Sequence, residues 1–229
     1  MNDFLNQLRL VGDWLTSSAQ WHGDDGIPNR LAEHLTYSGL SLLFATLIGL
    51  SLGLLVGHTG RGAFAVASVA NFARAIPTFG LVVLVVTVVG ISVTPVLIAL
   101  TALAIPPILI NTFEGIQGAD ADTKDAARGM GMTGWEVLWK VEIPMALPLI
   151  LLGLRVAAIQ IVATATVAAY PGLGGLGRYI VDGLSRNDYQ LVIGGSAVIV
   201  ILALVVQVVF TVLRRVIVSP GLLGSARSS

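Results

Sequence analysis

Two short patterns in the sequence match signatures of enzyme active sites, but each lacks the elements that its chemistry needs. The run from Gly49 to Gly53 has the G-x-S-x-G form that presents a nucleophilic serine on a strand-to-helix turn. Gly172, Gly174 and Gly177 form G-x-G-x-x-G, which binds a dinucleotide only after a strand of a βαβ unit. Both patterns lie in or directly after long apolar runs. We predict no active site and no metal site, and the absence of cysteine excludes thiolate catalysis.

Two arginines, Arg74 and Arg155, lie inside apolar runs and could contact a polar solute. An arginine at the centre of a bilayer costs about 2.5–3.5 kcal/mol on insertion scales, so it must reach the interface, pair inside the protein or face an aqueous cavity. Arg155 lies deep in its run, where both a pathway role and an internal partner stay open. Arg74 lies near an expected helix end, which favours a side chain that reaches the interface.

The densest group of charges lies between residues 114 and 142. These 29 residues hold nine of the 26 charged side chains, and they separate two apolar runs. Asp120 or Asp122 is placed to cap a short helix, which Gly129 and Gly131 would end. The pattern predicts an organised polar loop rather than a flexible connection.

A second short helix is predicted after this one. Thr133 and Glu136 have the spacing of a capping box, and Trp135 and Trp139 would share one face of the helix. Pro144 then opens the next apolar run, since proline is tolerated in the first turn of a helix. The two helices form a hairpin of the size that fits a groove on a partner protein.

The rest of the chain has the composition of a membrane protein. Hydrophobic residues make up 55% and charged residues 11%, against roughly 25% charged residues in soluble domains. The mean hydropathy is +0.86. Because a crossing needs about 20 apolar residues, we predict an all-α membrane protein with five spans, at about 35–57, 64–89, 95–115, 145–169 and 190–213. A sixth span is possible if residues 62–89 form two short helices that are separated near Pro77.

Small residues recur every four positions along the first predicted span. They are Ser41, Ala45, Gly49, Gly53 and Gly57. On a helix this spacing places them on one face, where small side chains let another helix approach closely. We predict a packing face, with a pore-lining role as the alternative.

A glycine-rich segment follows the fourth predicted span. Its glycines are Gly172, Gly174, Gly175 and Gly177. Irregular backbone at membrane depth is tolerated only where protein or water covers it. The segment could therefore line a solute path or form an ordinary turn outside the membrane.

Basic residues predict the orientation of the chain. With the N-terminus outside and the C-terminus in the cytoplasm, the inner segments hold seven lysines and arginines and the outer segments four. Residues 1–31 form a separate N-terminal segment, in which Phe4, Leu5, Leu8 and Trp14 recur as in an amphipathic helix at the interface. Residues 216–229 form a cytoplasmic tail. The net charge of zero gives no reason to expect a nucleic-acid partner.

The polar loop resembles a known family motif. Asp125-Ala126-Ala127, Gly131 and Pro144 follow the spacing of E-A-A-x3-G-x9-I-x-L-P, the "EAA" loop of permeases from binding-protein-dependent ABC importers. Aspartate replaces the first glutamate, Val141 the isoleucine and Ile143 the leucine. The segments around Pro77, Pro106-Pro107, Ala126–Thr133 and Gly172–Gly177 are similar to the osmoprotectant branch, and the likeness covers about residues 32–215.

The resemblance implies a type I importer permease, with a coupling loop at about 117–144 on the cytoplasmic side. The residues that would contact the ATPase are Asp125, Ala126, Ala127, Gly129, Gly131 and Pro144. The implied partners are an ATPase dimer carrying ATP and Mg, a second permease copy or a paralogue, and an extracytoplasmic binding protein. The implied location is the cell membrane of a prokaryote. This chain has no G-x-x-x-x-G-K-[ST] phosphate loop, so it is not expected to bind a cofactor or hydrolyse ATP itself.

The implied cargo is a quaternary amine such as glycine betaine, choline or carnitine. One alternative is the same importer fold serving another small polar solute, such as an amino acid. Another is an ion-coupled secondary transporter, which predicts carboxylates inside the spans; the predicted span interiors contain none.

Overall fold

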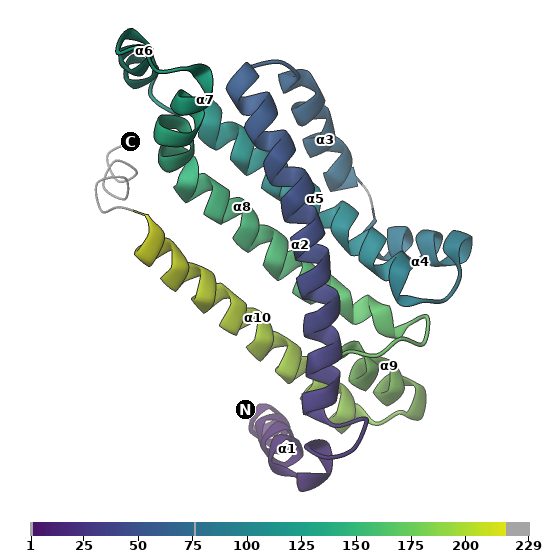
Figure 1. Cartoon of the computed structure of the whole chain (residues 1–229). Coiled ribbons are helices and arrows are strands. Elements are labelled where there is room, and N and C mark those ends of the chain that lie inside the picture. Colours follow the sequence, from purple (N-terminus) through teal and green to yellow (C-terminus); the bar gives the residue numbers. More distant parts are fainter. Residues whose placement is uncertain (1, 76, 219–229) are drawn as a thin grey trace. The chain divides into compact units, whose positions relative to one another are not determined.

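The computed structural model describes residues 2–75 and 77–218, and the side chains of residues 2–8, 70, 71, 73, 74 and 78 lie outside the description. The described chain contains helices and turns and no strand (Figure 1). The elements are α1 (Asn2–Thr16), η1 (Ser18–Gln20), α2 (Ile27–Thr59), α3 (Ala63–Ala75), α4 (Thr78–Val89), α5 (Val93–Gln117), α6 (Ala121–Gly129), α7 (Gly134–Val137), η2 (Leu138–Glu142), α8 (Ile143–Thr164), η3 (Ala165–Ala169), α9 (Gly177–Arg186) and α10 (Tyr189–Ile217).

Four helical stretches of the described chain are long and apolar enough to cross a membrane. They are Ile27–Thr59, Val93–Gln117, Gly134–Ala169 and Tyr189–Ile217. The third is a continuous path through α7, η2, α8 and η3. The all-helical membrane architecture predicted from composition is therefore confirmed.

Residues 64–89 form two helices rather than one continuous span. Both α3 and α4 are shorter than the roughly 20 residues that a crossing needs. Pro77 is the N-cap of α4, where its missing N–H and fixed φ favour the start of a new helix over the continuation of the previous one. The structure therefore agrees with the alternative prediction of two short helices with a break near Pro77.

The described chain divides into two compact units. The first unit comprises Met1–Leu42, Pro77–Thr101 and Ile159–Val205, and the second comprises Leu43–Ile76, Ala102–Ala158 and Val206–Ser229. The helices α2, α5, α8 and α10 each contribute residues to both units.

The core of the first unit includes the end of α1. Trp14 packs edge to face against Tyr179 of α9, with ring centroids 5.3 Å apart and the rings inclined by 83°. Gly194 and Gly195 of α10 lie directly against these two rings, so that a side chain at either position would overlap them. The side chains of Phe4, Leu5 and Leu8, which carry part of the predicted apolar face of α1, lie outside the described residues.

The core of the second unit depends on close contact between α2 and α5. A Cβ atom on Gly53 would lie 2.6 Å from the Cβ of Thr112, and one on Gly57 would lie 2.7 Å from the Cβ of Ile116. Real Cβ atoms do not approach this closely, so the two backbones can meet only because glycine has no side chain. Ile116 is fully buried in this contact.

We predict opposite effects for two alanine substitutions in α2. Gly53→Ala should lower stability by about 1–3 kcal/mol, because the added methyl overpacks the contact with Thr112. Gly39→Ala is the matched control, since nothing lies within 4 Å of its Cβ position and alanine favours a helix by up to about 1 kcal/mol. The measurement is the thermal unfolding midpoint of the purified protein in detergent. Equal midpoints for the two variants would contradict the close helix contact.

Candidate functional site

The first arm of the polar hairpin is a well-capped helix, α6. The Asp120 carboxylate accepts hydrogen bonds from the hydroxyl and the backbone N–H of Thr123, at 2.7 and 2.8 Å. These hydrogen bonds hold the pKa of Asp120 below its usual range. The helix ends at Gly129, and Gly131 follows with a φ of 86°, which a glycine adopts without strain. The chain can therefore reverse direction directly after α6.

The second arm begins with the predicted capping box, which is confirmed. The Glu136 N–H donates to the Thr133 hydroxyl at 3.3 Å, and the Thr133 N–H donates to the Glu136 carboxylate at 3.0 Å. Trp135 and Trp139 lie on one face with ring centroids 5.5 Å apart. The helix then widens into η2, a π-helical turn, before α8 begins.

The residues of the expected coupling motif differ in exposure. Asp125 and Ala126 are exposed on α6, whereas Ala127 is only 2% exposed. Ala127 is therefore positioned to pack inside the hairpin. Met130 and Trp135 are large apolar side chains that are 73% and 67% exposed. Met130 did not stand out in the sequence, although a large apolar residue within a charged segment is a signal of a contact surface.

The stem of the hairpin is attached to the end of α2, which no sequence pattern indicated. His58 Nδ1 lies 2.6 Å from the Glu142 carboxylate, and the Gln117 amide donates to the carbonyl of Gly57 at 2.6 Å. The two partners of the first contact are 84 positions apart.

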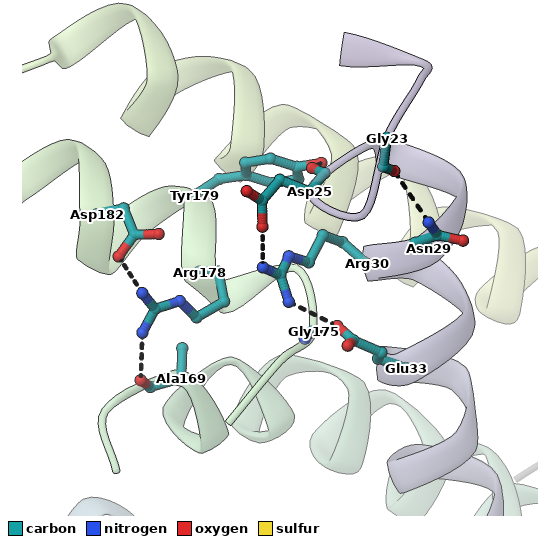
Figure 2. A network of polar contacts seen from close by, with 10 residues as sticks. All are labelled: Gly23, Asp25, Asn29, Arg30, Glu33, Ala169, Gly175, Arg178, Tyr179 and Asp182. Atoms are coloured by element: carbon teal, nitrogen blue, oxygen red, sulfur yellow. Dashed lines mark hydrogen bonds and ion pairs between the residues drawn. The ribbon is translucent and has the colours of Figure 1, made fainter. Parts of the chain in front are cut away.

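The glycine-rich segment lies against the beginning of α2 in the first unit. The N–H of Gly175 donates to the Glu33 carboxylate at 2.7 Å. A Cβ atom on Gly174 would overlap the same carboxylate, so glycine is needed for this close approach. Figure 2 shows Glu33 beside Arg30, which donates to it at 2.9 Å and also pairs with Asp25.

Helix α9 continues this polar network. Arg178 donates to the carbonyl of Ala169 at 3.3 Å and pairs with Asp182 at 2.5 Å (Figure 2). The Tyr179 hydroxyl donates to the carbonyl of Asp25 at 2.7 Å. Burial raises the pKa of Tyr179 to about 12, which favours the protonated hydroxyl that donates this hydrogen bond. The network pairs both arginines with carboxylates, and it holds Gly175 of the glycine-rich turn against Glu33.

Arg155 has a partner within the second unit. Its Nε donates to the side-chain oxygen of Gln207 on α10 at 2.7 Å, and both side chains are half-buried. Arg74 belongs to α3, and its side chain lies outside the described residues. Among the residues that the structure describes, no group of three or more histidine, aspartate or glutamate side chains could hold a metal ion.

Solved structures define the class to which this fold belongs. A chain of the MetNI methionine ABC transporter, in an inward-facing conformation, matches with a TM-score of 0.73, covering 84% of this chain and 96% of that chain at 22% identity. A chain of an amino acid ABC transporter with histidines matches with a TM-score of 0.69, covering 82% and 92% at 20% identity. At these identities the likeness shows the fold, which is that of the membrane-spanning permease subunits of ABC importers.

The sequence comparisons then identify the family. A family model described as "Binding-protein-dependent transport system inner membrane component" matches residues 45–219. The chain belongs to this family, and it is a transport subunit rather than an enzyme. It is 33% identical over 195 residues to the glycine betaine/carnitine/choline transport system permease protein OpuCB of Bacillus subtilis, covering 85% of this chain and 90% of the relative. It is 35% identical over 175 residues to the carnitine transport permease protein OpuCB of Listeria monocytogenes, covering 76% and 80%.

We predict that Arg155 depends on Gln207 for stability. Gln207→Leu should lower the free energy of unfolding by about 1–3 kcal/mol, because it leaves a half-buried guanidinium without its acceptor. Gln207→Glu is the matched variant, since it keeps an acceptor at the same position. Unfolding in detergent measures both. The same midpoint for Gln207→Leu and the unmodified protein would contradict the dependence.

Proposed function

We propose that this chain is the permease of an ATP-driven importer of quaternary-amine osmolytes such as glycine betaine, choline or carnitine. The observation that carries this proposal is the likeness to the Bacillus subtilis permease, which extends over 85% of this chain and 90% of that protein. The osmoprotectant import permease protein OsmW of Salmonella typhimurium supports it, at 33% identity over 195 residues. All three solutes carry a quaternary ammonium group, which is permanently charged and has no hydrogen-bond donor on its nitrogen, and glycine betaine and carnitine also carry a carboxylate.

The orientation that fits this function has the N-terminus outside and the C-terminus in the cytoplasm. If α3 and α4 together make one crossing, the chain crosses five times and its ends lie on opposite sides. The hairpin, which connects α5 to α8, and the basic pair at the end of α10 then share the cytoplasmic side. The glycine-rich turn and α9 lie outside.

The hairpin is the part of the chain that would receive movement from a separate ATPase dimer carrying ATP and Mg. Its exposed residues Asp125, Ala126, Met130 and Trp135 form the contact surface, while Ala127 supports α6 from inside. Gly129 and Gly131 form the turn between the two arms of the hairpin, and Pro144 lies in the first turn of α8, where the hairpin ends. Two permease copies, or this chain and a paralogue, would then open alternately toward the binding protein and the cytoplasm.

The solute path itself would lie between the two permeases. Arg155, Arg74 and the glycine-rich turn at Gly172, Gly174, Gly175 and Gly177 stay candidates for lining or gating it. Of these, Arg155 has a half-exposed side chain at a position well inside α8. The turn is held by Glu33, so it would move together with the beginning of α2.

An amino acid is the second candidate cargo, because both solved neighbours are amino acid or methionine transporters. Their identity of 20–22% is far below that of the osmolyte permeases, which favours the osmolyte. Family membership argues against the ion-coupled secondary transporter.

Transport by the assembled complex tests the cargo. The permease should be reconstituted in liposomes with its ATPase and binding protein, and the accumulation of labelled glycine betaine, choline, carnitine, methionine and histidine should be measured. We expect ATP-dependent accumulation of at least one quaternary amine, and none of the two amino acids. Accumulation of an amino acid alone would contradict the proposed cargo.

We further predict that Gly131→Asp abolishes uptake while the chain stays membrane-inserted. The substitution forces a side chain and a charge onto a left-handed position in the turn of the hairpin. Gly131→Asn is the matched variant, because asparagine tolerates this conformation without adding a charge, and we expect it to retain more uptake. Co-purification with the ATPase and uptake measure both variants. Unchanged uptake by Gly131→Asp would contradict the proposal that the hairpin couples the ATPase to transport.

A further inference from the structure

The last turn of α2 contacts both stems of the hairpin. On the side where the hairpin leaves α5, the Gln117 amide donates to the Gly57 carbonyl at 2.6 Å, and Gly57 lies directly against Ile116. On the side where it returns, His58 Nδ1 lies 2.6 Å from the Glu142 carboxylate. All of these residues belong to the second unit. A single helical turn therefore holds the base of the hairpin from both directions.

The second of these contacts is buried and specific. The Glu142 side chain is 3% exposed and the His58 side chain 24%. A carboxyl group at this depth is tolerated only with a hydrogen-bond partner, and short bonds to ionisable groups are the strong ones. The Nε2 edge of the His58 ring also lies 3.5 Å from the Cβ position of Gly134, at the start of α7. The imidazole thus contacts Glu142 at the end of the segment from α7 to η2, and a side chain at Gly134, at its beginning, would contact the same ring.

The local helix geometry serves the same contact. Glu142 is the last residue of the π-helical turn η2, which spans Leu138–Glu142. A π turn inserts an extra residue, and such turns are rare in helices and concentrate at functional sites. At 3.6 residues per turn, a one-residue insertion rotates the following side chains by about 100° around the helix axis. The direction of the Glu142 side chain therefore depends on a feature that ordinary α-helix would lack.

We propose that the His58–Glu142 pair makes the hairpin and the cytoplasmic end of α2 move as one rigid body. A displacement of the hairpin by the ATPase would then be transmitted directly to a membrane-spanning helix. His58 and Glu142 are positioning residues, since they act through the hairpin and need no contact with the solute. The inference rests on the proposed function, in which the hairpin receives the movement of the ATPase.

The absence of cysteine from the chain allows a sharp test. The double variant His58→Cys with Glu142→Cys removes the pair, and a short bifunctional thiol reagent restores a covalent link between the two positions. The readout is the amount of osmolyte taken up per ATP hydrolysed by the complete complex in liposomes. Without the reagent we expect this ratio to fall at least fivefold, and with the reagent we expect it to return to within twofold of the unmodified complex.

Two single substitutions distinguish a loss of coupling between ATP hydrolysis and uptake from a loss of folding. Glu142→Gln should lower the ratio, whereas Glu114→Gln should not, because Glu114 is an exposed glutamate near the end of α5. Co-purification of the ATPase with each variant establishes that the complex is assembled, so that a low ratio reports lost transmission.

Two results would overturn the proposal. The first is an assembled, uncrosslinked double variant with the ratio of the unmodified complex, which would make the pair a structural contact alone. The second is loss of uptake on crosslinking, which would mean that the contact opens during the cycle. Failure of the proposed function is distinguishable, because the unmodified complex would then accumulate no quaternary amine.

Discussion

The constraint behind most of this structure is that the hydrocarbon interior of a bilayer cannot accept or donate hydrogen bonds. Every polar group inside a span must then find its partner within protein. Several side chains of the described helices meet this requirement by pairing with groups from distant parts of the chain, although the hydroxyls of Ser38, Ser41 and Thr112 are buried without a partner. The ring of His34 bonds to the carbonyl of Val162, Arg155 bonds to Gln207, and His58 bonds to Glu142. Each pairing also joins two helices, so satisfying a polar group and fixing the packing are the same event.

Features that depend on neighbouring residues were predictable from the sequence. The Asp120 cap, the box formed by Thr133 and Glu136, and the turn at Gly131 are all local, since their spacing is set by helix geometry. Four of the five predicted spans lie within long apolar helices, because apolar run length follows the thickness of a bilayer, whereas the predicted span at 64–89 is divided near Pro77. The helix that contains the first predicted span, at about 35–57, begins earlier, at Ile27. Arg30 and Glu33 lie in this additional part of the helix, where they pair with each other.

The contacts that position the candidate site were not predictable, because they join residues far apart in sequence. Glu33 and Gly175 are 142 positions apart, and Arg155 and Gln207 are 52 apart. The composition of each segment gives no indication of the segment that it contacts. The π-helical turn could not be predicted from the sequence either, because the residues from Leu138 to Glu142 have the pattern of an ordinary α-helix. Resemblance to a family supplied the role of the hairpin, whereas only the structure shows what the hairpin is fastened to.

The break before α4 has a consequence for assembly. A helix leaves its last four carbonyls and its first four N–H groups without internal partners. Two short helices in place of one long span therefore expose a second set of such groups, and Pro77 provides no side-chain cap for α4. Backbone N–H and C=O groups without hydrogen-bond partners are unfavourable in hydrocarbon. The N–H groups in the first turn of α4 therefore need partners from protein or water, which the hydrocarbon of a bilayer cannot supply.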